Sequence, residues 1–287
     1  MHFIYKIPGP ILVLLGGFAL SWGGLIIRSF ESANIWQILF YRSLFFLLAL
    51  IIFLFLTYGK ETIKKIRVAG IQGLLGGAFL SVSFVAYMYS MTETTVANVV
   101  FIISTQTIFL PVLAYFFLKE KISPRGLVAI VLAMIGVALM IGDSIGTGSL
   151  YGNIAALAIP INFSILILII RKYPNLDMIP AIFYAGILSC IYGLLLIDSI
   201  MITAKDIWFS FLLGVPQLAI GFICITIGSR TTPAVMVGLL MLMETIFAPI
   251  WVWLFYSEIP PLSVLIGGLI IISAVVMKSL DYNKKVQ

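Results

Sequence analysis

The sequence TIFAP at residues 245–249 repeats an earlier stretch of the same chain, TIFLP at residues 107–111. An offset of 138 residues extends this match without a gap, so that 74–140 align with 212–278 and 15 of the 67 positions are identical. Both copies lie in long apolar runs. The repeat predicts a chain made of two related units. The apolar runs predict whether these units lie in water or in a membrane.

The chain is far more apolar than a soluble protein. Of its 287 residues, 62% are hydrophobic and 10% are charged, whereas soluble domains average about 45–50% apolar and about 25% charged residues. A membrane-crossing helix needs about 20 mostly apolar residues. Ten runs meet this requirement, at 9–27, 34–57, 68–90, 95–118, 123–142, 150–170, 177–198, 206–228, 233–256 and 261–279. Because they are continuous rather than alternating, they predict an all-α integral membrane protein with ten transmembrane helices.

The two units are expected to insert in opposite orientations. A second offset, of 143 residues, pairs IIR at 26–28 with IIR at 169–171, so the predicted halves are 1–143 and 144–287. Each half holds five of the runs, and an odd number of crossings turns the second copy upside down. Inverted repeats of this kind recur in secondary transporters, with a substrate site near the membrane midplane between the repeats. The sequence therefore predicts a central cavity between the halves.

The basic residues predict how the chain sits in the membrane. Of the 17 lysines and arginines, only Arg28 and Lys205 fall at the ends of runs on one side, and Arg42 falls inside a run. The other 14 lie on the side of the two termini. Because short cytoplasmic loops carry an excess of Lys and Arg, both termini are expected in the cytoplasm, with the chain crossing the inner membrane several times. The net charge of +6 then reflects this topology, and no nucleic-acid partner is expected.

Few residues could support enzymatic chemistry. His2 is the only histidine, and Cys190 and Cys224 stand apart inside predicted helices. We therefore expect no metal site, no cofactor and no catalytic residue. A phosphate-binding loop is also missing, so ATP-driven transport is not predicted. An integral membrane enzyme acting on lipids stays as an alternative, although its usual clusters of carboxylates or histidines do not occur here.

Glu244 is the main candidate for function. It lies 11 residues from the start and 12 from the end of its run, and a carboxylate at such depth costs about 2.5–3.5 kcal/mol on insertion scales. Such a group persists where it faces a wet cavity, pairs with a cation or binds a proton, which makes protons a candidate coupling ion. Trp251 shares its helix face, and the repeat places Gln106 at the equivalent position of the first half.

Arg42 is the other deeply placed charge, eight residues into the second run. Together, Arg42 and Glu244 could bind the carboxylate and amine of a zwitterion, or they could form a structural ion pair. Trp22, Tyr41 and Tyr87 are further candidates for substrate contact. The weaker polar candidates within runs are Gln72, Asn98, Asn162 and Gln217.

Pro111 and Pro249 lie inside runs and at equivalent positions of the repeat. Proline removes a helical hydrogen bond and kinks a helix. We therefore predict that these two prolines shape the cavity wall or act as hinges.

These features resemble the EamA-type family of the drug/metabolite transporter superfamily. The resemblance covers essentially the whole chain and rests on Trp22-Gly23, on Phe40 and Arg42, and on the series Ala97, Pro111, Glu120 with its copy Ala234, Glu244, Pro249, Glu258. It implies a basket-like fold of ten helices around a central cavity. It also implies transport of small organic metabolites, with functional roles for Arg42, Glu244, Pro111 and Pro249.

The sequence thus predicts a secondary transporter of a small organic metabolite, embedded in the lipid bilayer. The expected substrate is a zwitterionic or cationic compound that resembles an amino acid or its derivative. Because the family also includes importers of nucleotide-like metabolites, S-adenosylmethionine is the alternative substrate.

Overall fold

The computed structural model describes residues 4–94, 96–141, 150–257 and 262–286, and the secondary-structure elements in these ranges are all helices. The first part of the chain forms η1 (Ile4–Lys6), α1 (Gly9–Leu20), α2 (Gly23–Arg28), α3 (Ile35–Tyr58), η2 (Gly59–Glu61), α4 (Thr62–Glu93), α5 (Val96–Ser104), α6 (Gln106–Leu118) and α7 (Pro124–Ile141). The second part forms α8 (Leu150–Lys172), α9 (Ile179–Leu196), α10 (Ala204–Leu212), η4 (Leu213–Ala219), α11 (Ile220–Gly228), α12 (Ala234–Met241), α13 (Met243–Tyr256) and α14 (Leu262–Val286).

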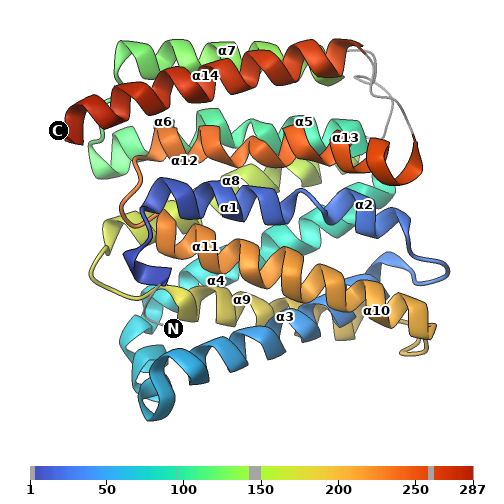
Figure 1. Ribbon diagram of the computed structural model, residues 1–287. Helices are drawn as coiled ribbons and strands as arrows, with labels where there is room; N and C mark the ends of the chain where they lie inside the picture. The colour runs from blue at the N-terminus through green and yellow to red at the C-terminus, as the bar shows by residue number, and fades with distance from the viewer. Residues whose placement is uncertain (1–3, 95, 142–149, 258–261, 287) are drawn as a thin grey trace.

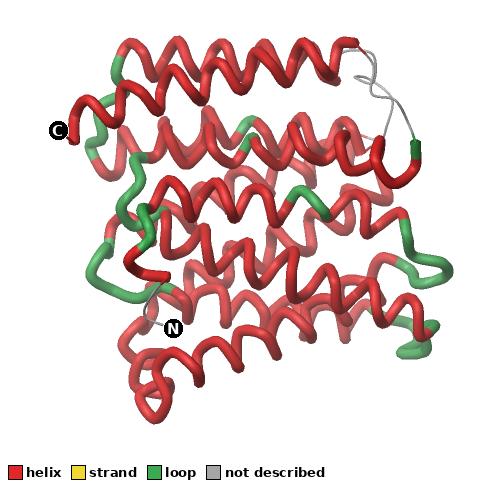
Figure 2. The backbone as a smooth tube through the Cα atoms, viewed as in Figure 1, coloured by secondary structure: helices red, strands yellow, loops and turns green. Residues whose placement is uncertain are grey.

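The helices lie alongside one another in a single bundle. Helices α7 and α14 pair along one edge, α3 and α10 lie at the opposite edge, and the two ends of the chain are at the same end of the bundle (Figure 1). Most connections gather at the two ends of the helices (Figure 2). Between its two ends, the molecule therefore consists of apolar helices.

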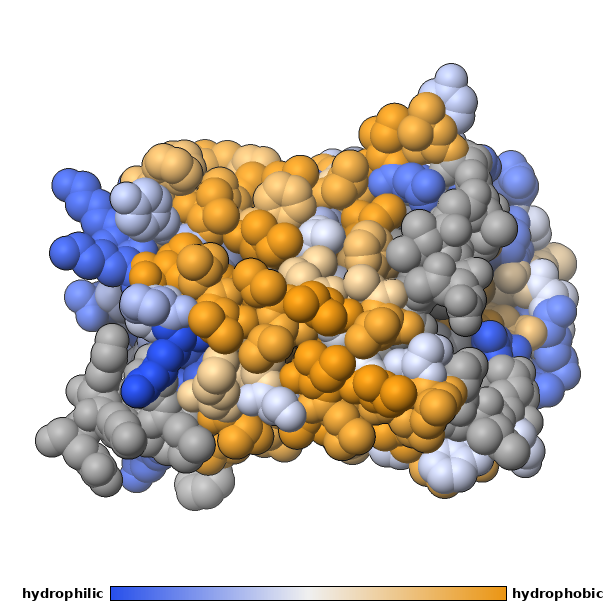
Figure 3. Space-filling model, turned by 90° about the horizontal axis from the view of Figure 1, so that it is seen from above, coloured by the Kyte–Doolittle hydropathy of each residue, from blue (hydrophilic) through white to orange (hydrophobic). Residues whose placement is uncertain are grey.

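Within the described ranges, seven stretches of helix are long and apolar enough, by length and composition, to cross a membrane. One of them, Ile35–Met91, is 57 residues long and covers two of the predicted runs, and the shorter apolar helices Pro124–Leu139 and Leu265–Lys278 coincide with two more. A hydrophobic belt lies between hydrophilic ends on the face shown in Figure 3. The chain is therefore a multi-pass membrane protein, while the number of ten crossings stays a prediction.

Helices of the first half pack mainly on helices of the second half. Helix α1 contacts α11 and α12, while α4 and α6 contact α8, α3 contacts α9, and α7 contacts α14. The contacts of α1 with α11 and α12 are those that a two-fold exchange of repeats would give from the contacts of α8 with α4 and α5. Close approach requires small residues, because a Cβ on Gly77 of α4 would lie 2.6 Å from the carbonyl oxygen of Ala181 in α9.

Several of the apolar helical stretches are interrupted within their length. Single residues, Thr105 and Leu242, separate α5 from α6 and α12 from α13, and residues 21–22 separate α1 from α2. Pro111 lies inside α6, six residues after the break at Thr105. Pro249 lies within the span of α13, seven residues after Leu242. The breaks are thus displaced from the prolines, and the hinge role of both prolines stays a prediction.

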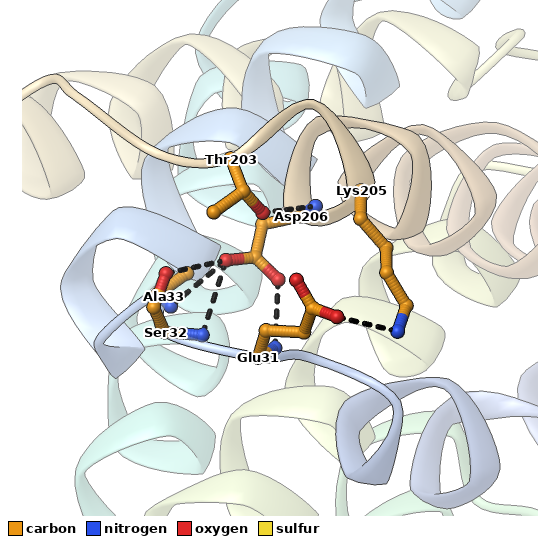
Figure 4. A network of polar contacts seen from close by, with 6 residues as sticks. All are labelled: Glu31, Ser32, Ala33, Thr203, Lys205 and Asp206. Carbon is orange, nitrogen blue, oxygen red and sulfur yellow. Dashed lines mark hydrogen bonds and ion pairs between the residues drawn. The ribbon is translucent and has the colours of Figure 1, made fainter.

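Buried polar contacts hold each end of the bundle together. Far from the termini, the buried Asp206 carboxylate accepts hydrogen bonds from the backbone N–H groups of Glu31, Ser32 and Ala33 at 2.8, 3.2 and 3.0 Å (Figure 4). The Ser32 hydroxyl donates to the same carboxylate at 3.1 Å. Asp206 thereby ties the start of α10 to the connection between α2 and α3.

At the end that holds the termini, Glu120 forms an ion pair with Arg171. Its other oxygen accepts a hydrogen bond from the backbone N–H of Ala234, the first residue of α12, at 3.2 Å. Its repeat partner, Glu258, lies outside the described residues. Nearby, the Tyr5 hydroxyl donates to Asp177 at 2.7 Å, and burial raises the pKa of this tyrosine, which therefore keeps its proton.

Candidate substrate-binding cavity

A cavity of about 80 Å³ lies between the two halves. It is lined by residues of α1, α3, α4, α8, η4 and α11 and by residues next to the breaks at Thr105 and Leu242. Four of the polar residues that line it are Arg42, Tyr87, Gln106 and Glu244. All four are among the predicted site residues. The volume provides room for a few water molecules or a very small solute.

The lining is built from repeat-related pairs. The offset of 138 residues pairs Gln106 with Glu244, and both line the cavity. The further pairs that share the lining are Leu80 with Leu218, Phe84 with Phe222, Ile103 with Met241 and, at the offset of 143, Leu20 with Phe163. The cavity therefore surrounds the expected axis between the repeats.

Most of the polar residues that line the cavity have apolar residues at the equivalent positions of the other half. Arg42 corresponds to Ala185, and Tyr87 corresponds to Ile225. Gln217 also lines the cavity, and its equivalent in the first half is an apolar phenylalanine. A symmetric apolar wall thus carries an asymmetric set of polar groups, which suits a solute with chemically different ends.

Arg42 is held by aromatic groups and by one backbone acceptor. Its side chain is 3% exposed, and its guanidinium carbon lies 5.2 Å from the ring centre of Phe84 and 5.8 Å from that of Tyr87. One terminal nitrogen donates to the carbonyl oxygen of Phe84 at 3.3 Å, and Nε has no partner among the described residues. A guanidinium has five N–H donors, so this buried cation retains capacity to bind an anionic group.

Glu244 provides the opposite charge. It is the second residue of α13 and lines the same cavity as Arg42. No ion pair within 4.0 Å joins these two side chains in the described part of the chain. One cavity therefore holds a basic and an acidic side chain that are not directly bonded to each other.

Three predicted site residues do not line this cavity. Trp22 and Trp251 stack on each other, with ring centres 4.2 Å apart, and the Trp251 indole N–H donates to the Ser21 hydroxyl at 2.8 Å. Trp22 lines a separate groove next to the cavity. The Tyr41 hydroxyl donates to the carbonyl oxygen of Ile200 at 2.6 Å, in the connection between α9 and α10. Substrate contact by Trp22, Trp251 and Tyr41 stays a prediction.

Sequence reasoning missed the aromatic wall. Phe84 and Phe222 meet edge to face with ring centres 5.4 Å apart, and Phe163 lies 6.3 Å from Phe222. Phenylalanine within an apolar run carries no signal of its own. The identity of Phe84 and Phe222 across the repeat was the one available indication.

Comparison with known proteins agrees with this architecture. A model of the EamA-like transporter family matches residues 7–142 and 150–280. A solved crystal structure matches with a TM-score of 0.82 over 97% of this chain and 99% of its own, at 14% identity. At this identity, the likeness concerns the fold alone.

Three relatives carry names that concern transport. An uncharacterized transporter of Clostridium kluyveri is 25% identical over 84% of this chain and 82% of its own length. Human solute carrier family 35 member G1 is 24% identical, covering 93% and 77% of the two chains. An S-adenosylmethionine uptake transporter of Rickettsia felis is 27% identical, covering 88% and 83%.

Proposed function

Because the chain belongs to the EamA-like transporter family, we propose that it carries a small zwitterionic or cationic compound, similar to an amino acid or its derivative, through the central cavity. The observation that carries this proposal is the pair of opposite charges in one cavity, with an N–H donor of Arg42 unpaired among the described residues. The substrate carboxylate binds at Arg42, and its ammonium group binds at Glu244. The apolar wall accepts the rest of the solute.

S-adenosylmethionine is the second candidate, favoured by the names of the Rickettsia relatives. It carries the same carboxylate and ammonium groups together with a sulfonium and an adenine ring. The aromatic wall of Phe84, Phe163 and Phe222 offers surfaces for stacking of this ring. A nucleoside derivative is larger than a cavity of about 80 Å³, so its binding requires the surrounding helices to move apart.

The test is uptake into proteoliposomes that contain the purified protein, with radiolabelled amino acids and S-adenosylmethionine supplied separately. We expect one class of compound to accumulate. Arg42→Lys, which keeps the charge but loses the planar donor set, and Glu244→Gln should each lower uptake about tenfold or more, equivalent to about 1.4 kcal/mol.

The controls are Arg67→Lys and Glu61→Gln, which make the same changes at exposed positions and should leave uptake unchanged. Undiminished uptake in both cavity variants would overturn the site. Competition decides between the two substrates, since an S-adenosylmethionine carrier should not be inhibited by a simple amino acid at equal concentration.

A further inference from the structure

The amide of Gln106 is a buried polar group that faces the central cavity. Gln106 is the first residue of α6, is 4% exposed and lines the cavity. Among the residues that the structure describes, neither the oxygen nor the nitrogen of this amide has a hydrogen-bond partner. The Oε1 of Gln217 also lacks a partner but is enclosed by surrounding atoms, whereas both atoms of the Gln106 amide keep accessible surface. A solute in the cavity can therefore reach both ends of this amide.

The hydrogen bonds that the amide can form define the group that it can bind. A glutamine amide has two N–H donors and one carbonyl acceptor, and a buried polar group that stays unpaired is costly. A solute satisfies both ends only if it carries an acceptor and a donor side by side in one plane. Glutamine binds the edge of adenine through two parallel hydrogen bonds in this way, and a carboxamide offers the same pair of atoms.

The repeat partner of Gln106 differs from it in charge but not in shape. Gln106 and Glu244 are equivalent across the repeat, and both line the cavity. An ionised carboxylate only accepts hydrogen bonds, whereas an amide of the same size also donates them. A second carboxylate would also place two like charges in one buried site, which is unfavourable. Gln106 therefore suits an uncharged part of the solute, while Glu244 suits its cation.

The backbone of Gln106 is held in place by the helix that packs on it. An added Cβ on Gly238 of α12 would lie 3.1 Å from the Cα of Thr107 and 3.7 Å from the carbonyl oxygen of Gln106. Thr107 is fully buried, and its hydroxyl donates to the carbonyl oxygen of Ser104 at 2.7 Å. These contacts fix the start of α6, so that a firmly packed backbone presents the amide to the cavity. A binding group that is positioned in advance favours specificity.

We propose that Gln106 determines the substrate specificity of the cavity by selecting a solute with a planar donor–acceptor group. This inference rests on the proposed function, because it takes Arg42 and Glu244 to hold the carboxylate and the ammonium group. The carboxamide of an amino acid side chain supplies such a group, and so does the amino edge of adenine. Asparagine is the smallest amino acid with a carboxamide, and it enters a cavity of about 80 Å³ with less movement of the helices than a nucleoside requires.

The test measures dissociation constants for two matched pairs of compounds by calorimetry, with the full-length protein in lipid nanodiscs. Asparagine is compared with leucine, which replaces the carboxamide by an apolar group of similar shape. S-adenosylmethionine is compared with its N6,N6-dimethyl analogue, which lacks the donors of the adenine edge. We expect the wild type to bind the donor–acceptor member of one pair about tenfold more tightly, the effect of two hydrogen bonds. The pair that shows this preference identifies the source of the group.

Variants at position 106 assign the preference to the amide. Gln106→Leu removes the donors and the acceptor, so the two members of the pair should bind equally. Gln106→Glu keeps the shape but replaces the amide by a carboxylate, so 2,4-diaminobutyrate, with its second ammonium group, should bind about tenfold more tightly than asparagine. The control is Gln72→Leu, which makes the same change at a half-buried position of α4 outside the cavity and should keep the preference of the wild type.

Failure of this inference and failure of the proposed function give different results. Equal binding within both pairs by the wild type, or a preference that persists in Gln106→Leu, would overturn the role of Gln106 and leave the proposed function intact. A wild type that binds none of the four compounds would overturn both. A preference that is also lost in Gln72→Leu would mean that the effect is not specific to the cavity, and the role of Gln106 would be rejected.

Discussion

Asp206 shows how a single buried side chain joins distant parts of this chain. Its carboxylate receives three backbone N–H groups and one hydroxyl group from residues 31–33. The loop that supplies them has no regular secondary structure to satisfy these donors. Asp206 therefore fixes the connection between α2 and α3, in which Ser29 lines the groove.

We expect Asp206→Ala to destabilise the protein. The loss leaves partly buried donors of residues 31–33 without their acceptor, at a cost of about 2 kcal/mol, and should lower the melting temperature by roughly 4–8 °C. Thermal unfolding of the purified protein in detergent measures this change. The control is Lys205→Ala, which removes the neighbouring ion pair with Glu31, whose side chains are 54% and 50% exposed, and should shift the melting temperature by less than about 2 °C. Equal shifts in both variants would show that the hydrogen bonds of the Asp206 carboxylate stabilise the protein no more than the exposed ion pair does.

At the same scale, the sequence was a better guide to the charged residues that line the cavity than to the aromatic ones. A deep Glu244 and a deep Arg42 are conspicuous in an apolar run because each is costly there, and the structure brings both to one cavity. Trp22 and Trp251 were also expected at the site, yet they pack on each other. Helical spacing predicts which side chains share a face, but it does not show which neighbouring helix covers that face.

At the scale of the helices, the positions of the breaks beside the cavity could not be predicted from the sequence. The sequence marks Pro111, but the helix is interrupted at Thr105, where the hydroxyls of Ser104 and Thr105 bond to carbonyl oxygens three residues earlier. Such local bonds compete with the helical pattern. Serine and threonine are common enough in membrane helices that this signal cannot be distinguished in advance.

The prolines nevertheless remain candidates for the moving parts of the cycle. We expect Pro111→Ala to restore a regular helical hydrogen bond and to stiffen α6, lowering the maximal transport rate about fivefold with little change in substrate affinity. The measurement is initial uptake rate against substrate concentration. Pro124→Ala at the start of α7, where proline is well tolerated, is the matched control. A change in affinity alone would assign Pro111 to the binding site rather than to a hinge.

For the whole molecule, the sequence predicted the class of fold, an all-helical membrane protein. The uneven distribution of lysine and arginine predicts how the chain is oriented relative to the membrane. The helix bundle by itself has no such orientation. The ends of the chain lie at one end of the bundle (Figure 1), and the orientation of that end is open to direct measurement.

We expect that end to face the cytoplasm. In a background with Cys190→Ser and Cys224→Ser, a single cysteine at Lys205 should react with a membrane-impermeant maleimide added to intact cells. A cysteine at Lys60, between α3 and α4, should react only after the cells are permeabilised, because basic loops stay inside. The reverse pattern would mean that the protein is inserted the other way round.

The packing of α1 on α11 also has a consequence for biosynthesis, because the two helices are synthesised at different times. Gly16 of α1 leaves room for Ile225 of α11, whose side chain would lie 2.5 Å from an added Cβ, and about 200 residues separate the two helices in the chain. At about 5–20 residues per second, a ribosome needs roughly 10–40 s to reach the second partner after completing the first. During that interval the earliest helix waits in the bilayer, with its glycine-lined face covered by lipid or by the insertion machinery.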